Sequence, residues 1–387
     1  MGTTGEGHGS TIRYLLSQYP IQRRIIHDLD TRSILNLCRT SSGLREDLRT
    51  YLWDINKKLG RFFQDPVAFR AELGRADALI SGSFALQFFA NKFWPESDLD
   101  INLREGEGVE SLGKYLVEAE GYELTRNQDI ELLDYDTFCR LQHIERIVTY
   151  TKSAGGGRTS SQVLKVQLVA TKNHPVAAIL GTYYTSCIVN FISWNKAYCV
   201  FPRATLLFRE TVVLTHANDY DVELHKKYSR RGWRLRTRPV NLGRRDRSKK
   251  YPRDTFPLGV CLGQDRRIGG ADTWTMKLGT AGVARPPQPD SVLEYSNASS
   301  IRIHIDVFKS PSLRYEYTFG SLQPYWSYVG GVLTGNTRGQ LRAKMIQSEA
   351  DSIEAGGRLY DAEFPKPDGW DFWDDWLPDA FEEVMGT

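Results

Sequence analysis

The chain has 387 residues, of which 41% are hydrophobic and 25% charged, and its formal net charge at pH 7 is only +3. This composition is ordinary for a soluble globular protein, and the length allows two or three domains. No run approaches the roughly 18 apolar residues that a membrane-spanning helix needs, so we expect no membrane partner. The five cysteines are odd in number and lack zinc-site spacing, which indicates reduced thiols in a cytoplasmic or nuclear protein.

The N-terminal part of the chain is predicted to be a short lead followed by helices. Residues 1–10 are rich in glycine and threonine, without a basic start or an apolar stretch, so we expect a disordered lead and not a secretory signal. Over residues 11–75, apolar residues recur at three- and four-residue steps, which predicts short amphipathic helices. Asp30 or Ser33 is expected to cap one of these helices, and Gly43 to end it.

Residues 21–48, within this helical region, resemble an F-box, the helical module that docks onto a ubiquitin-ligase adaptor. The Leu-Pro opening that is usual in that module is missing here. The resemblance implies a protein partner that binds through the N-terminal helices. A plain helical subdomain that packs against the next domain is the simpler interpretation of the same pattern, and we prefer it.

Residues 76–215 predict an α+β domain. Apolar runs and helical spacings alternate along this part of the chain. The expected strands are residues 76–81, 98–103, 146–151, 163–170, 187–193 and 197–200, and the expected helices are residues 84–93, 109–120 and 176–180. This order suits a mixed sheet backed by helices. Residues 216–387 carry weaker signals, such as a β-like run at 301–308, and are expected to form a C-terminal α/β extension.

The small net charge hides two oppositely charged segments in this extension. Residues 226–253 hold thirteen Lys or Arg and one acid, whereas residues 351–387 hold eleven acids and two bases. The basic segment can contact nucleic-acid phosphates, with Tyr228, Trp233 and Tyr251 stacking on bases, but a solvated loop is the preferred interpretation. The acidic, tryptophan-rich tail is either a docking peptide for a protein partner or a clamp onto the body of the protein, and we prefer the clamp.

The most informative segment joins a glycine-serine bend to a pair of acids. Gly82 allows a sharp turn, and Ser83 follows at the expected start of a helix, where free N–H groups and the helix dipole favour a phosphate. Asp98 and Asp100 are two residues apart on an expected strand, so both side chains point to one face. Two carboxylates on one face favour a divalent cation such as Mg²⁺ or Mn²⁺. The segment therefore predicts a nucleoside triphosphate held with a metal ion.

This pattern resembles the nucleotidyltransferase-fold superfamily, whose signature is an apolar residue, Gly, Gly or Ser, a gap, and then Asp-x-Asp between apolar residues. Gly82, Ser83, Asp98 and Asp100 occupy those positions. Over residues 78–205 the chain also resembles a group of fungal proteins built on this fold. The strings that carry this second resemblance are residues 80–89, 97–101, 165–168, 189–192 and 201–202. The resemblance implies phosphate binding by the bend and metal binding by the two aspartates.

The resemblance also implies a third carboxylate on a later strand, and Gln167 stands at the position expected for it. Alternation along that strand puts Lys165 on the same face as Gln167. An amide oxygen can ligate a metal but cannot take a proton at neutral pH, so the third position is degenerate. Glu96, Asp134 and Asp136 are alternative sources of a third acid.

Two functions follow from these patterns. The first is a nucleotidyltransferase-like protein that binds a nucleoside triphosphate with Mg²⁺ or Mn²⁺ and transfers a nucleotidyl group to an acceptor that the sequence does not identify. The alternative is a catalytically inactive scaffold of the same fold, a pseudoenzyme, or an F-box-like adaptor that acts through protein-protein contacts. Position 167 distinguishes the two functions, because a glutamine there leaves open whether the protein is catalytically active.

Overall fold

The computed structural model has two compact units, which are described one at a time. The residues that it describes are 29–130, 141–153, 163–211, 219–235, 265–286, 306–314, 323–360 and 364–377, with Tyr14, Arg24, Leu214 and the short stretches 239–240, 300–302, 316–319 and 379–380. Unit 1 comprises Met1–Thr182, Ile188–Pro202 and Arg267–Ser299, and unit 2 comprises Tyr183–Cys187, Arg203–Arg266 and Ser300–Thr387.

Several of the described helices of unit 1 precede its sheet, as the amphipathic spacing predicts. They are α3 (Thr31–Thr40), α4 (Ser42–Leu52), α5 (Ile55–Leu59) and α6 (Pro66–Arg75). Asp30 caps α3, because its carboxylate accepts a 2.8 Å hydrogen bond from the backbone N–H of Ser33. The expectation that Gly43 ends this helix is wrong. Ser41 is the C-cap, in an extended conformation, and Gly43 lies inside α4, because one extended residue is enough to separate the two helices.

The centre of unit 1 is a sheet whose described strands follow the order β12-β7-β6-β1-β2-β5-β4-β3. The strands are β1 (Leu79–Ser81), β2 (Leu99–Arg104), β3 (Glu123–Asp129), β4 (Ile144–Ser153), β5 (Val163–Thr171), β6 (Phe191–Ile192), β7 (Lys196–Cys199) and β12 (Trp274–Lys277). β2 and β5 pair in parallel, and the other neighbours in this order whose register is described pair antiparallel. The prediction of an α+β fold with a mixed sheet is therefore confirmed.

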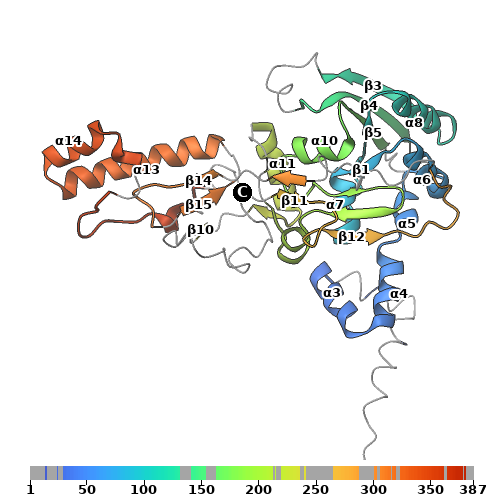
Figure 1. Ribbon diagram of the computed structural model, residues 1–387, viewed down its shortest axis with the longest axis horizontal. Coiled ribbons are helices and arrows are strands. Elements are labelled where there is room, and N and C mark those ends of the chain that lie inside the picture. The colour runs from blue at the N-terminus through green and yellow to red at the C-terminus, as the bar shows by residue number, and fades with distance from the viewer. Residues whose placement is uncertain are drawn as a thin grey trace, which may run out of the picture. The chain divides into compact units, whose positions relative to one another are not determined.

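Helix α8 (Glu107–Glu118) covers one face of this sheet at β3 and β5. The helices that alternate with its strands are α7 (Gly82–Ala90), α8 and α10 (Pro175–Thr182). α8 lies beside β3 and β5 (Figure 1). Gly113 of α8 is so close to Tyr150 of β4 that a Cβ would clash with the phenol hydroxyl, and Leu168 of β5 lies beside the same glycine. Because side chains alternate along a strand, Lys165 and Gln167 of β5 belong to the opposite face.

The sequence pattern did not predict the two edge strands of this sheet. Among the described strands β3 pairs only with β4, and six of its seven residues are exposed, so its side chains show no apolar alternation. β12 pairs with β7 through the contacts of Trp274 with Cys199 and of Met276 with Ala197. The sheet therefore takes a strand from beyond residue 215, where the sequence pattern placed the end of the domain.

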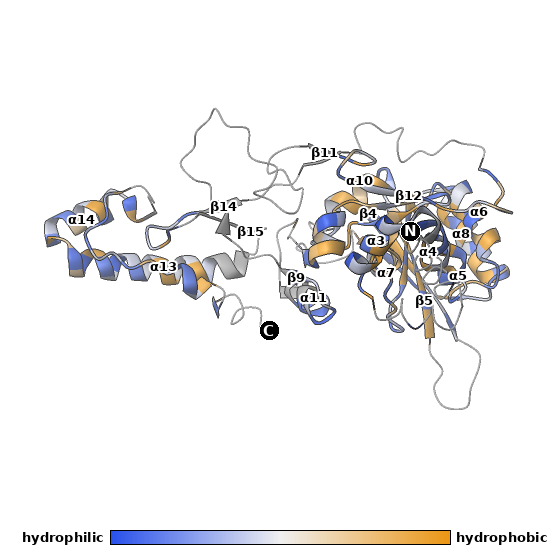
Figure 2. Cartoon of the chain, turned by 90° about the horizontal axis from the view of Figure 1, so that it is seen from below, coloured by the Kyte–Doolittle hydropathy of each residue, from blue (hydrophilic) through white to orange (hydrophobic). Residues whose placement is uncertain are grey.

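Unit 2 combines small sheets with helices. Its elements are η2 (Arg203–Phe208), β8 (Glu210–Thr211), α11 (Asp219–Arg230), β9 (Arg234–Leu235), β10 (Pro239–Val240), β13 (Ser300–Arg302), β14 (Asp306–Phe308), β15 (Glu316–Phe319), α13 (Gln323–Lys344), α14 (Gln347–Ala355), η3 (Arg358–Tyr360) and η4 (Asp374–Trp376), and β11 (Asp265–Arg267) reaches its boundary. β10, β15 and β14 form one antiparallel sheet. Hydrophobic residues of α13 and α14, orange in Figure 2, share a cluster that includes Leu341 and Ile353.

None of the described helices is long and apolar enough to cross a membrane.

Candidate functional site

The glycine-serine bend lies where β1 passes into α7. Gly82 has a φ of +65°, in the left-handed region that strains residues with a Cβ, so glycine is the residue that makes this turn without strain. Ser81 is the N-cap of α7, but its side chain makes no capping hydrogen bond to the helix. The Ser81 hydroxyl instead accepts a 2.6 Å hydrogen bond from the side-chain amide of Asn102 on β2. The first N–H groups of α7 are therefore left without a cap from Ser81, and such groups bind anions well.

Asp100 lies beside this bend, in a polar row across the sheet. It is directly opposite Ser81 in the antiparallel pairing of β1 with β2. On its other side it is directly opposite Gln167 in the parallel pairing of β2 with β5. Residues opposite one another share a face of the sheet. Asp98 precedes β2 by one residue and forms an ion pair with Lys165, which lies on the face of Gln167. Both carboxylates therefore share one face, as their spacing predicts.

Asp98 already has a cationic partner within the chain. Its Oδ2 lies 2.5 Å from Nζ of Lys165, and 34% of the aspartate side chain and 36% of the lysine side chain are exposed. Arg61, between α5 and α6, adds positive charge nearby and donates a 3.1 Å hydrogen bond to the carbonyl oxygen of Ser97. Burial lowers the pKa of the Arg61 guanidinium, and the charges of Glu96 and Asp98 oppose that shift. The positive charges of Lys165 and Arg61 thus both act on the carboxylate of Asp98.

The position expected to carry a third acid holds Gln167. Its side-chain amide donates a 3.4 Å hydrogen bond to the hydroxyl of Thr149 on β4. Glu96 is exposed in the turn before β2 and does not belong to the strand. Asp134 and Asp136 lie outside the described residues. In the part of the chain that the structure describes, no three His, Cys, Asp or Glu side chains come close enough together to hold a metal ion.

The oxygen donors on this face suit one hard divalent cation. Asp98 and Asp100 supply carboxylate oxygens, and Gln167 can add a neutral amide oxygen. Mg²⁺ takes oxygen ligands at about 2.0–2.1 Å and usually keeps waters or phosphate oxygens in several of its positions. Two carboxylates and a triphosphate would supply enough oxygen ligands for one such ion, provided that the ion pair of Lys165 with Asp98 opens.

Sequence reasoning missed three contacts that shape this site, those of Arg61, Lys165 and Asn102. Lys165 left a usable signal, because alternation puts it on the face of Gln167, but its pairing with Asp98 depends on which strands are neighbours. Arg61 left no signal, because it belongs to the helical region and lies 36 residues before the carbonyl that it contacts.

The two aromatic residues of the basic segment that the structure describes are buried inside unit 2. Trp233 is 1% exposed, and its indole N–H donates a 2.8 Å hydrogen bond to the carbonyl oxygen of Thr205. Tyr228 is 5% exposed. The idea that these two rings stack on nucleic-acid bases is therefore wrong, because both are used in packing. Tyr251 lies outside the described residues.

The acidic tail folds onto the rest of unit 2 through Trp370. This ring is 8% exposed, packs against Leu341 and its neighbours, and donates a 2.9 Å hydrogen bond to the carbonyl oxygen of Pro311. Gln340 of α13 forms two hydrogen bonds with the backbone of Asp371, at 2.7 and 2.9 Å. The interpretation of the tail as a clamp is confirmed for this stretch.

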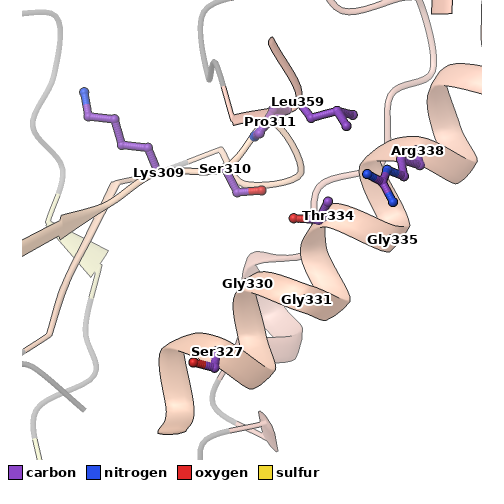
Figure 3. A pocket seen from close by; sticks show the side chains of 10 residues that line it. All are labelled: Lys309, Ser310, Pro311, Ser327, Gly330, Gly331, Thr334, Gly335, Arg338 and Leu359. Carbon is purple, nitrogen blue, oxygen red and sulfur yellow. The ribbon is translucent and has the colours of Figure 1, made fainter. Parts of the chain in front are cut away.

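A concave feature lies within unit 2, beside α13. Its volume is about 440 Å³. Gly330, Gly331 and Gly335 leave the helix backbone open, because a Cβ at each would meet no atom within 4 Å. Lys309 points away from α13, whereas Arg338 lies along it, so the two cations do not converge (Figure 3). The lining therefore does not specify a ligand.

The comparisons with known proteins leave the site to be interpreted from its own geometry. No protein-family model, curated protein or solved structure matches the chain.

Proposed function

We propose that unit 1 is a nucleotide-binding domain of the nucleotidyltransferase type, which binds a nucleoside triphosphate together with Mg²⁺ or Mn²⁺. The observation that carries this proposal is the direct pairing of Asp100 with Ser81, the residue before the Gly82 turn. The pairing brings a carboxylate next to a helix N-terminus that Ser81 does not cap. A cation on the carboxylate and the positive end of the helix can then act on the same triphosphate.

Each part of the site has a separate task in this proposal. Gly82 adds no Cβ at the bend, so no side chain there would oppose a phosphate, and the N–H groups of the first turn of α7, near Ser83, would supply donors. Asp98 and Asp100 hold the cation, which when bound neutralises charge on the phosphates. The sheet orients both aspartates toward the same side, so the chain supplies a fixed frame for the triphosphate.

Transfer of a nucleotidyl group is the finer part of the proposal, and Gln167 limits it. A carboxylate at this position would take the proton of an attacking hydroxyl, which a neutral amide cannot do. The loss of a general base costs roughly 10²–10⁴-fold in rate. We therefore expect nucleotide binding to be readily measurable and transfer to be slow.

A catalytically inactive scaffold is the second candidate, and the ion pair of Lys165 with Asp98 favours it. An ammonium group on a carboxylate neutralises that carboxylate without a metal ion. In this case the chain acts through protein-protein contacts made by helices α3 to α6 or by residues of the acidic tail.

A thermal-shift series separates the two candidates. The full-length protein is melted with each ribonucleoside triphosphate, in the presence of Mg²⁺, of Mn²⁺ and of neither. A ligand that binds only the native state adds about 2.7 kcal/mol of stability at 100 times its Kd. We expect at least one triphosphate to raise the Tm when a cation is present. Asp100→Asn should abolish this rise, whereas Asp129→Asn, on the exposed edge strand β3, should retain it.

Two results would decide against nucleotide binding. One is an unchanged Tm of the wild type with every triphosphate, which would favour the scaffold. The other is an equal loss of the rise in Asp129→Asn, which would indicate a general effect of charge. Release of pyrophosphate from the triphosphate, or transfer of an α-labelled nucleotidyl group to an acceptor, then measures whether the bound nucleotide reacts.

A further inference from the structure

Lys165 reaches Asp98 because of strand register. Asp100 lies directly opposite Gln167 in the parallel pairing of β2 with β5. The same register places the residues two positions earlier, Asp98 and Lys165, next to each other. Their Oδ2 and Nζ atoms are 2.5 Å apart. Since the backbone pairing sets this contact, it belongs to the architecture of the sheet and is more than a contact of two mobile surface side chains.

An ammonium group and a divalent cation compete for the same carboxylate. Mg²⁺ must approach an oxygen to about 2.0–2.1 Å, and it would be repelled by a positive charge on the neighbouring atom. The charge of Arg61 also acts on Asp98, which adds to the repulsion of a cation. About one third of each side chain of the pair is exposed, so solvent weakens this competition without removing it.

We propose that Lys165 competes with the divalent cation for Asp98 and keeps this site free of cation until a nucleotide binds. A bound triphosphate would offer the displaced ammonium a new anionic partner and would offer the cation further oxygen ligands. The role assigned to the nucleotide rests on the proposed function. Exclusion of the bare cation by Lys165 does not, and it is tested without nucleotide.

Mn²⁺ alone is the probe, because the free ion is measured directly by electron paramagnetic resonance. Full-length wild type, Lys165→Met and Lys172→Met proteins are titrated with Mn²⁺ in the absence of nucleotide. Lys172 lies just beyond the end of β5 and pairs with Glu145 at 3.9 Å, so Lys172→Met removes the same charge without touching Asp98. We expect Lys165→Met to bind Mn²⁺ about tenfold more tightly than the wild type or better, and Lys172→Met to match the wild type.

The proposal is overturned if Lys165→Met binds Mn²⁺ no better than the wild type, or if Lys172→Met gains as much. Circular dichroism checks folding, and Lys165→Gln replaces the methionine variant if that variant does not fold. Asp98→Asn added to Lys165→Met must remove the gain, because it removes the ligand. If Lys165→Met gains Mn²⁺ affinity but no nucleotide raises the Tm, the proposed function is rejected and the competition between Lys165 and the cation is supported. If a nucleotide raises the Tm but Lys165→Met gains no Mn²⁺ affinity, the proposed function is supported and the competition is rejected.

Discussion

The guanidinium of Arg61 donates a hydrogen bond to the carbonyl oxygen of Ser97 over 3.1 Å. A second N–H of the same group donates to the carbonyl oxygen of Trp94 at 3.0 Å. Arg61 comes from the helical region between α5 and α6, whereas Ser97 immediately precedes Asp98. A side chain from the turn between α5 and α6 therefore holds the backbone from which the first of the two carboxylates projects.

Replacing Arg61 should destabilise unit 1. In Arg61→Met these two carbonyl groups and that of Pro95, to which Arg61 also donates, lose their charged donor, and we expect a loss of about 1–3 kcal/mol in the free energy of unfolding. Urea denaturation followed by tryptophan fluorescence measures this loss. Arg75→Met is the control, because Arg75 is 56% exposed and pairs with Glu72 on the surface of α6. It should cost less than about 0.5 kcal/mol. Equal losses in both variants would contradict the role given to Arg61.

Gly82→Ala should also be destabilising, because the φ of +65° strains any residue with a Cβ. The left-handed conformation costs a residue other than glycine roughly 1–2 kcal/mol. Gly279→Ala is the matched control, since a Cβ at that position meets no atom within 4 Å. Urea denaturation should show a lower midpoint for Gly82→Ala and little change for Gly279→Ala. An unchanged midpoint for Gly82→Ala would mean that the bend relaxes into another conformation.

The glycines of α13 should behave in the opposite way. A Cβ at Gly331 or Gly335 meets no atom within 4 Å, and both residues lie in the interior of a helix. Alanine there should stabilise the helix by about 0.5–1 kcal/mol at each position. Gly369→Ala, at a φ of +72°, should destabilise unit 2 and serves as the control. Thermal melts of the single variants test this. Loss of stability in Gly331→Ala would show that the open face of α13 makes a contact in solution.

The stability of unit 1 should depend on pH through Lys58. Burial lowers the pKa of Lys58 from its ordinary 10.5 to about 8, with a further lowering by Lys57 and an opposing effect of Asp54. Between these two values the folded state binds fewer protons than the unfolded state, so this residue makes stability rise with pH. Its unfavourable contribution is fully present below about pH 8 and disappears as the pH approaches the unfolded value of about 10.5.

Lys58→Met should therefore be more stable than the wild type near neutral pH, and the difference should shrink as the pH rises. Urea denaturation over a series from about pH 7 to 10 measures the difference at each step. Lys114→Met, whose side chain is 68% exposed on α8, should show no such trend. A difference that stays constant with pH would mean that Lys58 is charged equally in both states.

Local patterns along the chain were sufficient to predict the elements that carry the site. The left-handed Gly82, the alternation that puts Lys165 and Gln167 on one face, and the two-residue spacing of Asp98 and Asp100 all depend on neighbours in sequence. Backbone conformation at a glycine and the two-residue period of a strand are short-range properties, and the residues themselves reveal them.

Pairing between distant segments required the folded chain. The local sequence does not indicate that Ser81 and Gln167 flank Asp100 or that Lys165 pairs with Asp98. It also does not indicate that a strand from beyond residue 215 joins the sheet. These relationships depend on which strands become neighbours and in what register, and that choice is made by the burial of apolar surface summed over the whole sheet. The residue types of the candidate site are thus visible in the sequence, whereas the charge that acts on each of them is set by tertiary contacts.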